Sequence, residues 1–208
     1  MREFIRERRL WIVIAMIALL PLYGCDDDSE DNDDQRDDIE SFLASYHDPK
    51  LIPQDEISSS IEDEPSFYFE FGTYAYLYID DYYNTSRDSK AQIVKGSQIT
   101  ITFRLYPFDG STISDSDLPT YTNDPAYEYS YIEAGLNTTY WSFEPLELVI
   151  GQSKILDSIQ EGLLMGCREG DSIEIYMTRN MGYGDDVIGV MEEDSAIAFF
   201  CTIDSVVN

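Results

Sequence analysis

Histidine and cysteine, two residue types that often carry out nucleophilic, acid–base or zinc chemistry, are rare in this chain. One histidine and three cysteines stand beside 41 Asp and Glu residues. His47 has no second histidine with which to build a His-based zinc site, and next to Pro49 we expect it to be a solvated linker residue, so Ser/His/Asp catalysis is not expected. No Asp run has the glycine and glutamate that an EF-hand loop needs at its sixth and twelfth positions. We therefore expect no metal and no cofactor.

Cys25 is the one residue for which the sequence predicts a chemical modification, because a signal-like segment precedes it. Four arginines within residues 1–9 are followed by an apolar run over residues 10–20, which is the order of a secretory signal peptide and is shorter than a membrane-spanning helix. The run ends in Leu22-Tyr23-Gly24-Cys25, which resembles a bacterial lipobox. That resemblance implies a lipoprotein signal over residues 1–24 and acylation of Cys25. A lipid anchor in the cell envelope follows, at the outer membrane, with the membrane face left open and surface exposure among the alternatives. An ordinary cleaved signal with an incidental cysteine is the alternative.

Charge separates a tether from a folded domain. The 208 residues carry a formal charge of −28, which disfavours nucleic acid as a partner, and ten of the fifteen residues from Asp26 to Glu40 are acidic. So charged a block predicts an extended, solvated tether over residues 25–65, and it resembles the acidic segment of surface-exposed Bacteroidetes lipoproteins. One short helix is expected within the tether, where apolar residues fall at helical spacing: Ile39, Phe42, Leu43 and Tyr46.

Residues 66–208 show the alternation of a β-rich domain. Every second residue is apolar in stretches that predict strands near residues 67–71, 74–78, 99–105, 146–150, 173–177 and 197–203. Only Ile155, Ile159 and Leu163, widened by Leu156 and Leu164, have helical spacing. The fold class expected is α+β, with an antiparallel sheet of about five or six strands wrapped on one short helix.

Two cysteines remain in this domain. Cys167 follows the predicted helix and Cys201 lies on the inward side of the last strand, where a free cysteine behaves as a small apolar residue. Two free thiols are favoured, and a disulfide between them is the alternative that an exported protein allows.

From Lys95 onward the order of elements resembles the FKBP family of peptidyl-prolyl isomerases. Three stretches carry the resemblance: Pro145-Leu-Glu-Leu-Val-Ile-Gly151 with the helix after it, Gly170-Asp171 leading to Met181-Gly182-Tyr183-Gly184, and the closing strand Ile197–Ile203. The resemblance covers about 110 residues and implies an FKBP-like domain that binds a prolyl peptide in an apolar cup.

The resemblance also assigns residues to that cup. Tyr183 matches the tyrosine whose hydroxyl donates a hydrogen bond to a peptide carbonyl, and Phe199 matches the aromatic residue of the pocket wall. Ile155 and Leu156 match an aliphatic pair, of which the second backbone amide contacts the ligand. These four are the expected catalytic residues. Further substrate-binding positions match Phe103, Ile113, Leu146, Ile159 and Asp115.

Several positions depart from the family pattern. Ile159 stands where the family has tryptophan, and Ser114 stands where it has the pocket aspartate, with Asp115 one place later. Met165 resembles a one-residue insertion, which leaves open whether Ile159 or Gln160 reaches the floor, and Met191-Glu192 replaces an Ile-Pro pair at the rim. Because the isomerase binds a twisted amide in an apolar pocket and needs no strong acid, base or metal, these losses predict weak catalysis. In the alternative, Tyr183 and Phe199 are simply core aromatics.

A tyrosine-rich insertion over about residues 117–141 has no counterpart in a minimal family member. It is expected either to pack its rings on the sheet as an extra hairpin or to form a recognition surface. Two functions follow: a lipid-anchored prolyl isomerase or chaperone acting on prolyl peptides or unfolded envelope proteins, or a non-catalytic FKBP-like module that holds an envelope protein or glycan. A monomer is expected in either case.

Overall fold

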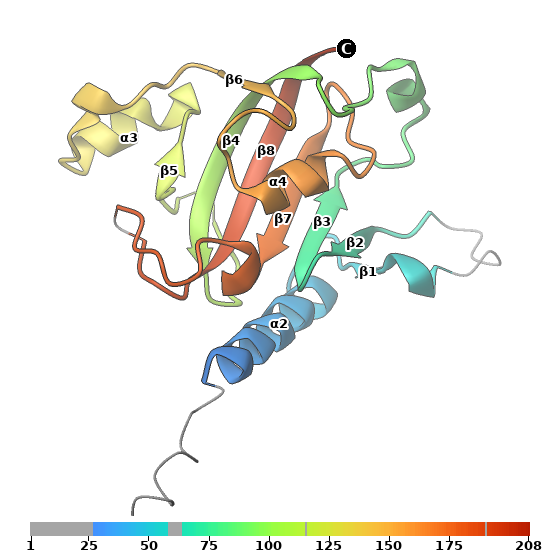
Figure 1. The fold of residues 1–208 in the computed structure, drawn as a ribbon, viewed down its shortest axis with the longest axis horizontal. Helices are drawn as coiled ribbons and strands as arrows, with labels where there is room; N and C mark the ends of the chain where they lie inside the picture. The colour runs from blue at the N-terminus through green and yellow to red at the C-terminus, as the bar shows by residue number, and fades with distance from the viewer. Residues whose placement is uncertain (1–26, 58–63, 115, 190) are drawn as a thin grey trace, which may run out of the picture. The chain divides into compact units, whose positions relative to one another are not determined.

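A computed structural model describes residues 27–57, 64–114, 116–189 and 191–208. The chain divides into two compact units, residues 1–31 and 32–208, and the second holds the fold discussed below. This unit is a mixed α+β domain (Figure 1). In the part of the chain that the structure describes, no helix is both long and apolar enough to cross a membrane.

One sheet organises the domain. Its described strands follow the order β1-β2-β3-β7-β8-β4-β5, β6 also pairs with β4, and every pairing is antiparallel except that of β1 with β2. All six predicted strands are confirmed, and two-residue strands are added at the edges. The bounds are β1 Ile52–Pro53, β2 Phe67–Phe71, β3 Ala75–Ile79, β4 Gln98–Phe108, β5 Tyr121–Thr122, β6 Leu146–Val149, β7 Ser172–Met177 and β8 Ala196–Val207.

The sheet buries both of its faces. Ala75, Leu77 and Ile79 of β3 pack on the side of helix α4 (Asp157–Leu163), and this cluster is the α4-side core. Tyr76 and Tyr78, which alternate with them, point to the other face and meet helix α2 (Asp27–Ser45). The second cluster is the α2-side core, formed by Ile39, Phe42, Leu43, Leu51, Tyr68, Tyr76, Tyr78, Phe108, Tyr176, Ala196 and Ala198.

Helix α2 corrects the expectation of an extended tether. The acidic block from Asp27 onward is helical, and the domain therefore begins within the segment that we assigned to the tether rather than at residue 66. The side chains of Asp33, Asp34, Asp37 and Asp38 are exposed, so they stay solvated while Ile39 on another face is buried. Arg36 pairs with Asp33 and Asp37 and relieves part of the repulsion along the helix. The predicted apolar positions are confirmed except for Tyr46, which lies beyond the helix and is 66% exposed.

His47 is buried rather than solvated. Its Nδ1 lies 2.5 Å from the carbonyl oxygen of Pro49 and its Nε2 lies 3.1 Å from Oε2 of Glu174 on β7. Tyr176 donates a hydrogen bond of 2.6 Å to the same Glu174 oxygen, and the ring of Tyr78 meets the imidazole edge-on at 5.0 Å. Two acceptors facing the two ring nitrogens favour the doubly protonated imidazolium. The loop after α2 is thereby joined to the sheet by an ion pair.

This geometry predicts a pH dependence of stability. Burial lowers the pKa of His47, but the hydrogen bond and charge of Glu174, the Pro49 carbonyl and the charge of Asp48 outweigh it, so the pKa is raised above its usual 6.5. A raised folded-state pKa adds stability that is complete below about pH 6.5 and is lost as the pH rises through the folded-state value. We expect urea unfolding to show that wild type loses stability as the pH rises above about 6.5, and that His47→Gln lacks this loss. The variant keeps every other titrating group, so parallel curves for the two proteins would contradict the imidazolium assignment.

Candidate functional site

Seven of the predicted cup residues lie in or against the α4-side core. Phe199 and Ile159 are buried within it, and five others are partly buried against it: Phe103, Leu146, Ile155, Leu156 and Tyr183. They come from β4, β6, β8, α4 and the loops beside them. We call these seven residues the cup.

Two long paired strands supply the aromatic wall of the cup. β4 and β8 run antiparallel with Phe103 opposite Cys201 and Leu105 opposite Phe199, so Phe103 and Phe199 are diagonal neighbours on one face. Their rings stack with centroids 5.6 Å apart and planes 26° apart. Such a pair stabilises the sheet whether or not a ligand binds, because aromatic pairs on one face of a ladder attract one another.

Helix α4 resolves which residue lies beneath the cup. Ile159 is 4% exposed and belongs to the core, whereas Gln160 turns away and accepts a hydrogen bond of 2.8 Å from the backbone N–H of Gly151. Of these two residues, Ile159 therefore packs with the other cup residues and Gln160 does not. An isoleucine presents less flat apolar surface than a tryptophan.

Tyr183 follows a short 3-10 turn, η5 (Arg179–Met181), which helix α4 holds in place. The Ser158 hydroxyl donates a hydrogen bond of 2.6 Å to the carbonyl oxygen of Met181. Burial, followed by the charge of Tyr121, raises the pKa of Tyr183 above its usual value of 10, so its hydroxyl stays protonated at neutral pH. Among the residues that the structure describes, this hydroxyl has no hydrogen-bond partner and is available as a donor.

Tyr121, which the sequence did not assign to the site, lies against the same cluster. It comes from β5 in the insertion, and its hydroxyl donates a hydrogen bond of 2.6 Å to the carbonyl oxygen of Ile188 in the loop after Tyr183. A Cβ atom at Gly189 would lie 2.0 Å from the Tyr121 oxygen, so glycine at this position, with φ of +64°, permits the approach. The insertion is thus fastened to the loop that carries Tyr183. Only the abundance of tyrosine in the insertion hinted at such a contact.

One predicted substrate-binding residue, Ile113, does not join the cup. Ile113 packs against the α2-side core, on the other face of the sheet, and lines a cavity there with Tyr106 and Phe108. The chain turns at Gly110, which has φ of +79° and approaches Asp38 of α2 so closely that a Cβ would lie 3.3 Å from the Asp38 Cβ. The turn carries the following loop toward α2. Ile113 therefore lies on the face opposite the cup, and the prediction that it lines the cup is wrong. Asp115 lies outside the described residues.

Three rings of the insertion, those of Tyr121, Tyr131 and Trp141, pack on one another. Tyr131 of α3 (Glu128–Glu133) is fully buried, with Trp141 and Phe143 beside it at ring-centroid distances of 4.9 and 5.7 Å. Tyr121 stacks on Trp141 at 5.8 Å with planes 17° apart. The rings do pack, but the segment is built on helical turns rather than as the hairpin that we expected, and Tyr129 remains 69% exposed.

Helix α2 also holds the loop that contains Tyr183. The side chain of Gln35 accepts a hydrogen bond of 2.7 Å from the backbone N–H of Arg179 and donates one of 2.6 Å to the carbonyl oxygen of Asp194. Arg179 in turn pairs with Asp185 and Asp194. Both ends of the loop therefore depend on α2, a link that no sequence signal indicated.

The cysteines and acidic residues add no reactive centre to the described part of the chain. Cys167 and Cys201 are free and buried, as favoured, and burial raises the pKa of both thiols, which keeps them unreactive. Within the described ranges, no group of three or more His, Cys, Asp or Glu side chains is placed to hold a metal ion. Cys25 lies outside these ranges.

The chain matches no protein-family model and no curated protein.

Proposed function

We propose that this protein is a lipid-anchored, FKBP-like prolyl isomerase or chaperone of the cell envelope with weak activity. The observation that carries the proposal is the gathering of Tyr183, Phe199 and five aliphatic or aromatic partners in one partly buried cluster on the α4 side of the sheet. The cup supplies apolar walls and one free hydroxyl donor, which suffice to favour a twisted prolyl amide over a planar one. The proposed lipid on Cys25 would hold the domain at the membrane.

A specific contact favours a non-catalytic binding module as the second candidate. The hydrogen bond from Tyr121 to Ile188 fastens the insertion across to the loop of Tyr183. A prolyl peptide that needs this space must displace Tyr121 or bind beside it, which weakens its binding. In this second function the cup stays closed, and the insertion holds an envelope protein or glycan.

A prolyl isomerisation assay on the purified full chain decides between the two functions. We expect a slow but measurable rate for wild type. Tyr183→Phe removes one neutral hydrogen bond and should weaken binding of a prolyl peptide by about 0.5–1.5 kcal/mol without loss of stability. Phe199→Ala removes a buried ring and should lower the free energy of unfolding by about 3–5 kcal/mol.

The matched control is Tyr129→Phe, which makes the same chemical change at a tyrosine that is 69% exposed. A measurable wild-type rate that Tyr183→Phe leaves unchanged would place the catalytic pocket elsewhere. An absent wild-type rate would support the binding module.

A further inference from the structure

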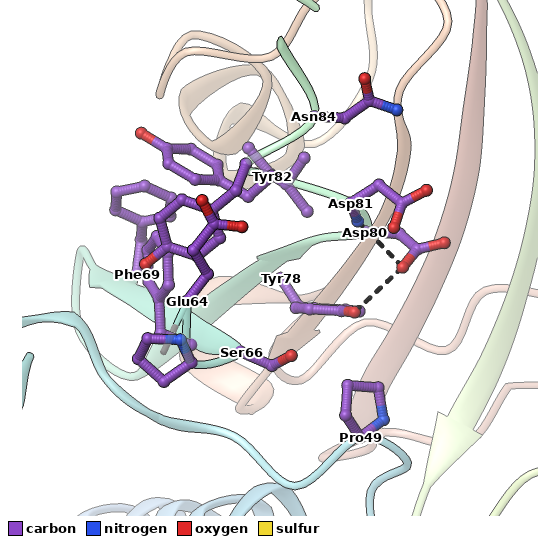
Figure 2. A pocket seen from close by; sticks show the side chains of 13 residues that line it. Pro49, Glu64, Ser66, Phe69, Tyr78, Asp80, Asp81, Tyr82 and Asn84 are labelled. Carbon is purple, nitrogen blue, oxygen red and sulfur yellow. Dashed lines mark hydrogen bonds between the residues drawn. The ribbon is translucent and has the colours of Figure 1, made fainter. Parts of the chain in front are cut away.

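A concave site lies beside strands β2 and β3, and none of its lining residues belongs to the cup. It is a cavity of about 420 Å³ that opens to solvent, and we call it the aromatic cleft. Figure 2 shows Phe69, Tyr82 and Glu64 together on one side of the cleft, and Tyr78 with Asp80 and Asp81 on the other. Phe67 and Tyr83 also line it.

Four aromatic rings form a connected wall of the cleft. The Phe67 ring meets Tyr82 at 4.9 Å, Phe69 at 5.1 Å and Tyr83 at 5.9 Å, each edge-to-face, and Tyr82 meets Tyr83 at 5.4 Å and 88°. In edge-to-face packing the rings are not parallel, so the wall presents ring faces in several directions. The negative face of an aromatic ring attracts cations.

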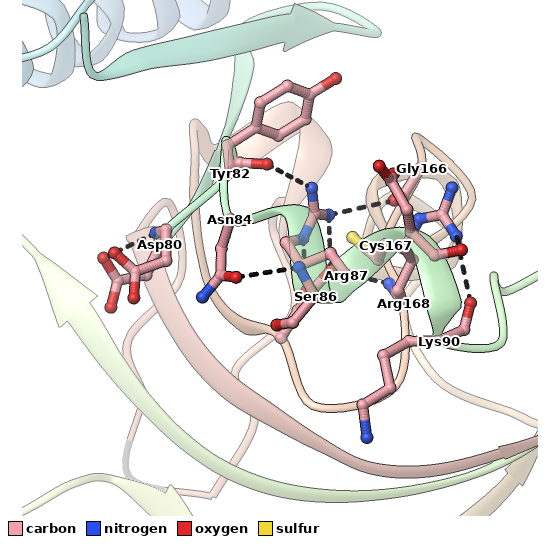
Figure 3. Close-up of polar contacts among 12 residues, drawn as sticks. Asp80, Tyr82, Asn84, Ser86, Arg87, Lys90, Gly166, Cys167 and Arg168 are labelled. Carbon is pink, nitrogen blue, oxygen red and sulfur yellow. Dashed lines mark hydrogen bonds and ion pairs between the residues drawn. The ribbon is translucent and has the colours of Figure 1, made fainter. Parts of the chain in front are cut away.

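The wall is held in place by the protein itself. The Arg87 guanidinium lies 4.8 Å from the centroid of the Tyr82 ring and donates a hydrogen bond of 2.8 Å to the Tyr82 carbonyl oxygen (Figure 3). The same group pairs with both oxygens of buried Asp171 at 2.7 and 2.8 Å. Tyr82 is therefore positioned before any ligand arrives, and it already stacks with a guanidinium.

The charged residues that line the cleft are all acidic. Glu64, Asp80 and Asp81 line it, and none of its lining residues is Lys, Arg or His. Asp80 accepts hydrogen bonds from the Tyr78 hydroxyl at 3.1 Å and from the Asp81 N–H at 3.0 Å, which fixes its carboxylate at the rim. Glu64 and Asp81 are exposed, and the charge of Glu64 reaches Tyr83, whose pKa is raised by burial and then by that charge. Aromatic faces beside carboxylates are complementary to an organic cation.

We propose that the aromatic cleft binds an arginine side chain of a basic polypeptide. The guanidinium is planar, stacks on aromatic faces and forks its N–H donors to carboxylates, whereas a lysine ammonium is a compact, strongly hydrated charge. The cavity is large enough for one such side chain and its neighbouring backbone. The formal charge of −28 would also speed the encounter with a basic partner. This site does not depend on the isomerase proposal.

The test measures binding of acetyl-Gly-Arg-Gly amide to the purified full chain at physiological salt, by calorimetry or NMR titration. The same peptide with citrulline, the neutral isostere of arginine, is expected to bind at least about fivefold more weakly because the charge-assisted contacts are lost. Glu64→Gln combined with Asp81→Asn should weaken the arginine peptide by at least about fivefold, and Tyr83→Leu by about threefold. Asn suits position 81, where φ is +49°, and both carboxylates are exposed, so stability should be kept.

The matched control separates a site from general attraction to an acidic protein. Asp186→Asn combined with Glu193→Gln removes two exposed carboxylates that do not line the cleft, and it should leave binding within about twofold. Equal weakening by the control pair and the cleft pair would overturn the proposal, as would equal binding of the citrulline peptide. Equal binding of a lysine peptide would overturn the choice of guanidinium.

Discussion

Phe42→Ala is expected to lower the free energy of unfolding by about 3–5 kcal/mol, because it empties the centre of the α2-side core. Phe42 is 4% exposed, and its ring meets Phe108 at 5.1 Å, Tyr176 at 5.4 Å and His47 at 5.8 Å. No neighbouring side chain can fill that volume without leaving its own contacts. Urea unfolding of the full chain measures the loss.

The control is Tyr46→Ala, four residues later, where the ring is 66% exposed and the change should stay within about 0.5 kcal/mol. Hydrogen exchange adds a second readout, since amides of residues 36–45 should be protected in wild type and lose protection first in Phe42→Ala. Random-coil shifts and fast exchange over this segment in wild type would restore the extended tether and refute the docked helix.

Arg87→Leu is expected to have an effect of similar size through charge rather than volume. It leaves the Asp171 carboxylate, whose side chain is 2% exposed, without its bidentate partner, and breaking a buried pair in this way costs about 3–5 kcal/mol. It also removes the hydrogen bond to the Tyr82 carbonyl oxygen. Thermal or urea unfolding provides the measurement.

A double-mutant cycle tests the cause. Asp171→Asn in the Arg87→Leu background removes the stranded charge yet keeps a side-chain oxygen that can accept from the backbone N–H of Arg168, a hydrogen bond of 2.7 Å in wild type. The double variant should therefore be more stable than Arg87→Leu alone. If the stability losses of Arg87→Leu and Asp171→Asn simply add in the double variant, the unpaired Asp171 carboxylate is not the cause of the destabilisation by Arg87→Leu. Arg36→Leu, at a surface pair with Asp37, should lower stability much less than Arg87→Leu does.

Local patterns were enough to predict the six longer strands of the sheet. Ile99 and Ile101 of β4, and Ile173 and Ile175 of β7, alternate with polar residues, and a period of two places them on one face whatever the rest of the chain does. The single helical stripe through Ile159 and Leu163 likewise predicted α4. In β3 the tyrosines between the core residues were not recognised as a second buried face, because tyrosine occurs both at surfaces and in cores.

The residues of the cup were grouped by their resemblance to a family, and the fold does bring seven of them to one side of the sheet. Ile113 was misplaced because its position depends on the turn at Gly110 and on its contact with α2, which no local pattern encodes. The contact of Tyr121 with the loop after Tyr183 was missed for the same reason, because its hydrogen-bond partner Ile188 is 67 residues away in the chain.

The sequence by itself determined the six longer strands and helix α4, because hydrophobic periodicity acts over a few residues. Only the tertiary structure decided that the acidic segment docks. In the first turns of α2, Asn32 is buried and Gln35 is half-buried, and because both are polar no apolar stripe marks this face of the helix. The side chain of Gln35 forms its hydrogen bonds with the backbone of Arg179 and Asp194. Burying a polar side chain is tolerated only when hydrogen-bond partners are present. The partners of Gln35 are more than 140 residues away in the chain. The same reason applies to His47. From the sequence alone a lone histidine beside a proline is expected at the surface, and its burial depends on the hydrogen bond with Glu174 of β7.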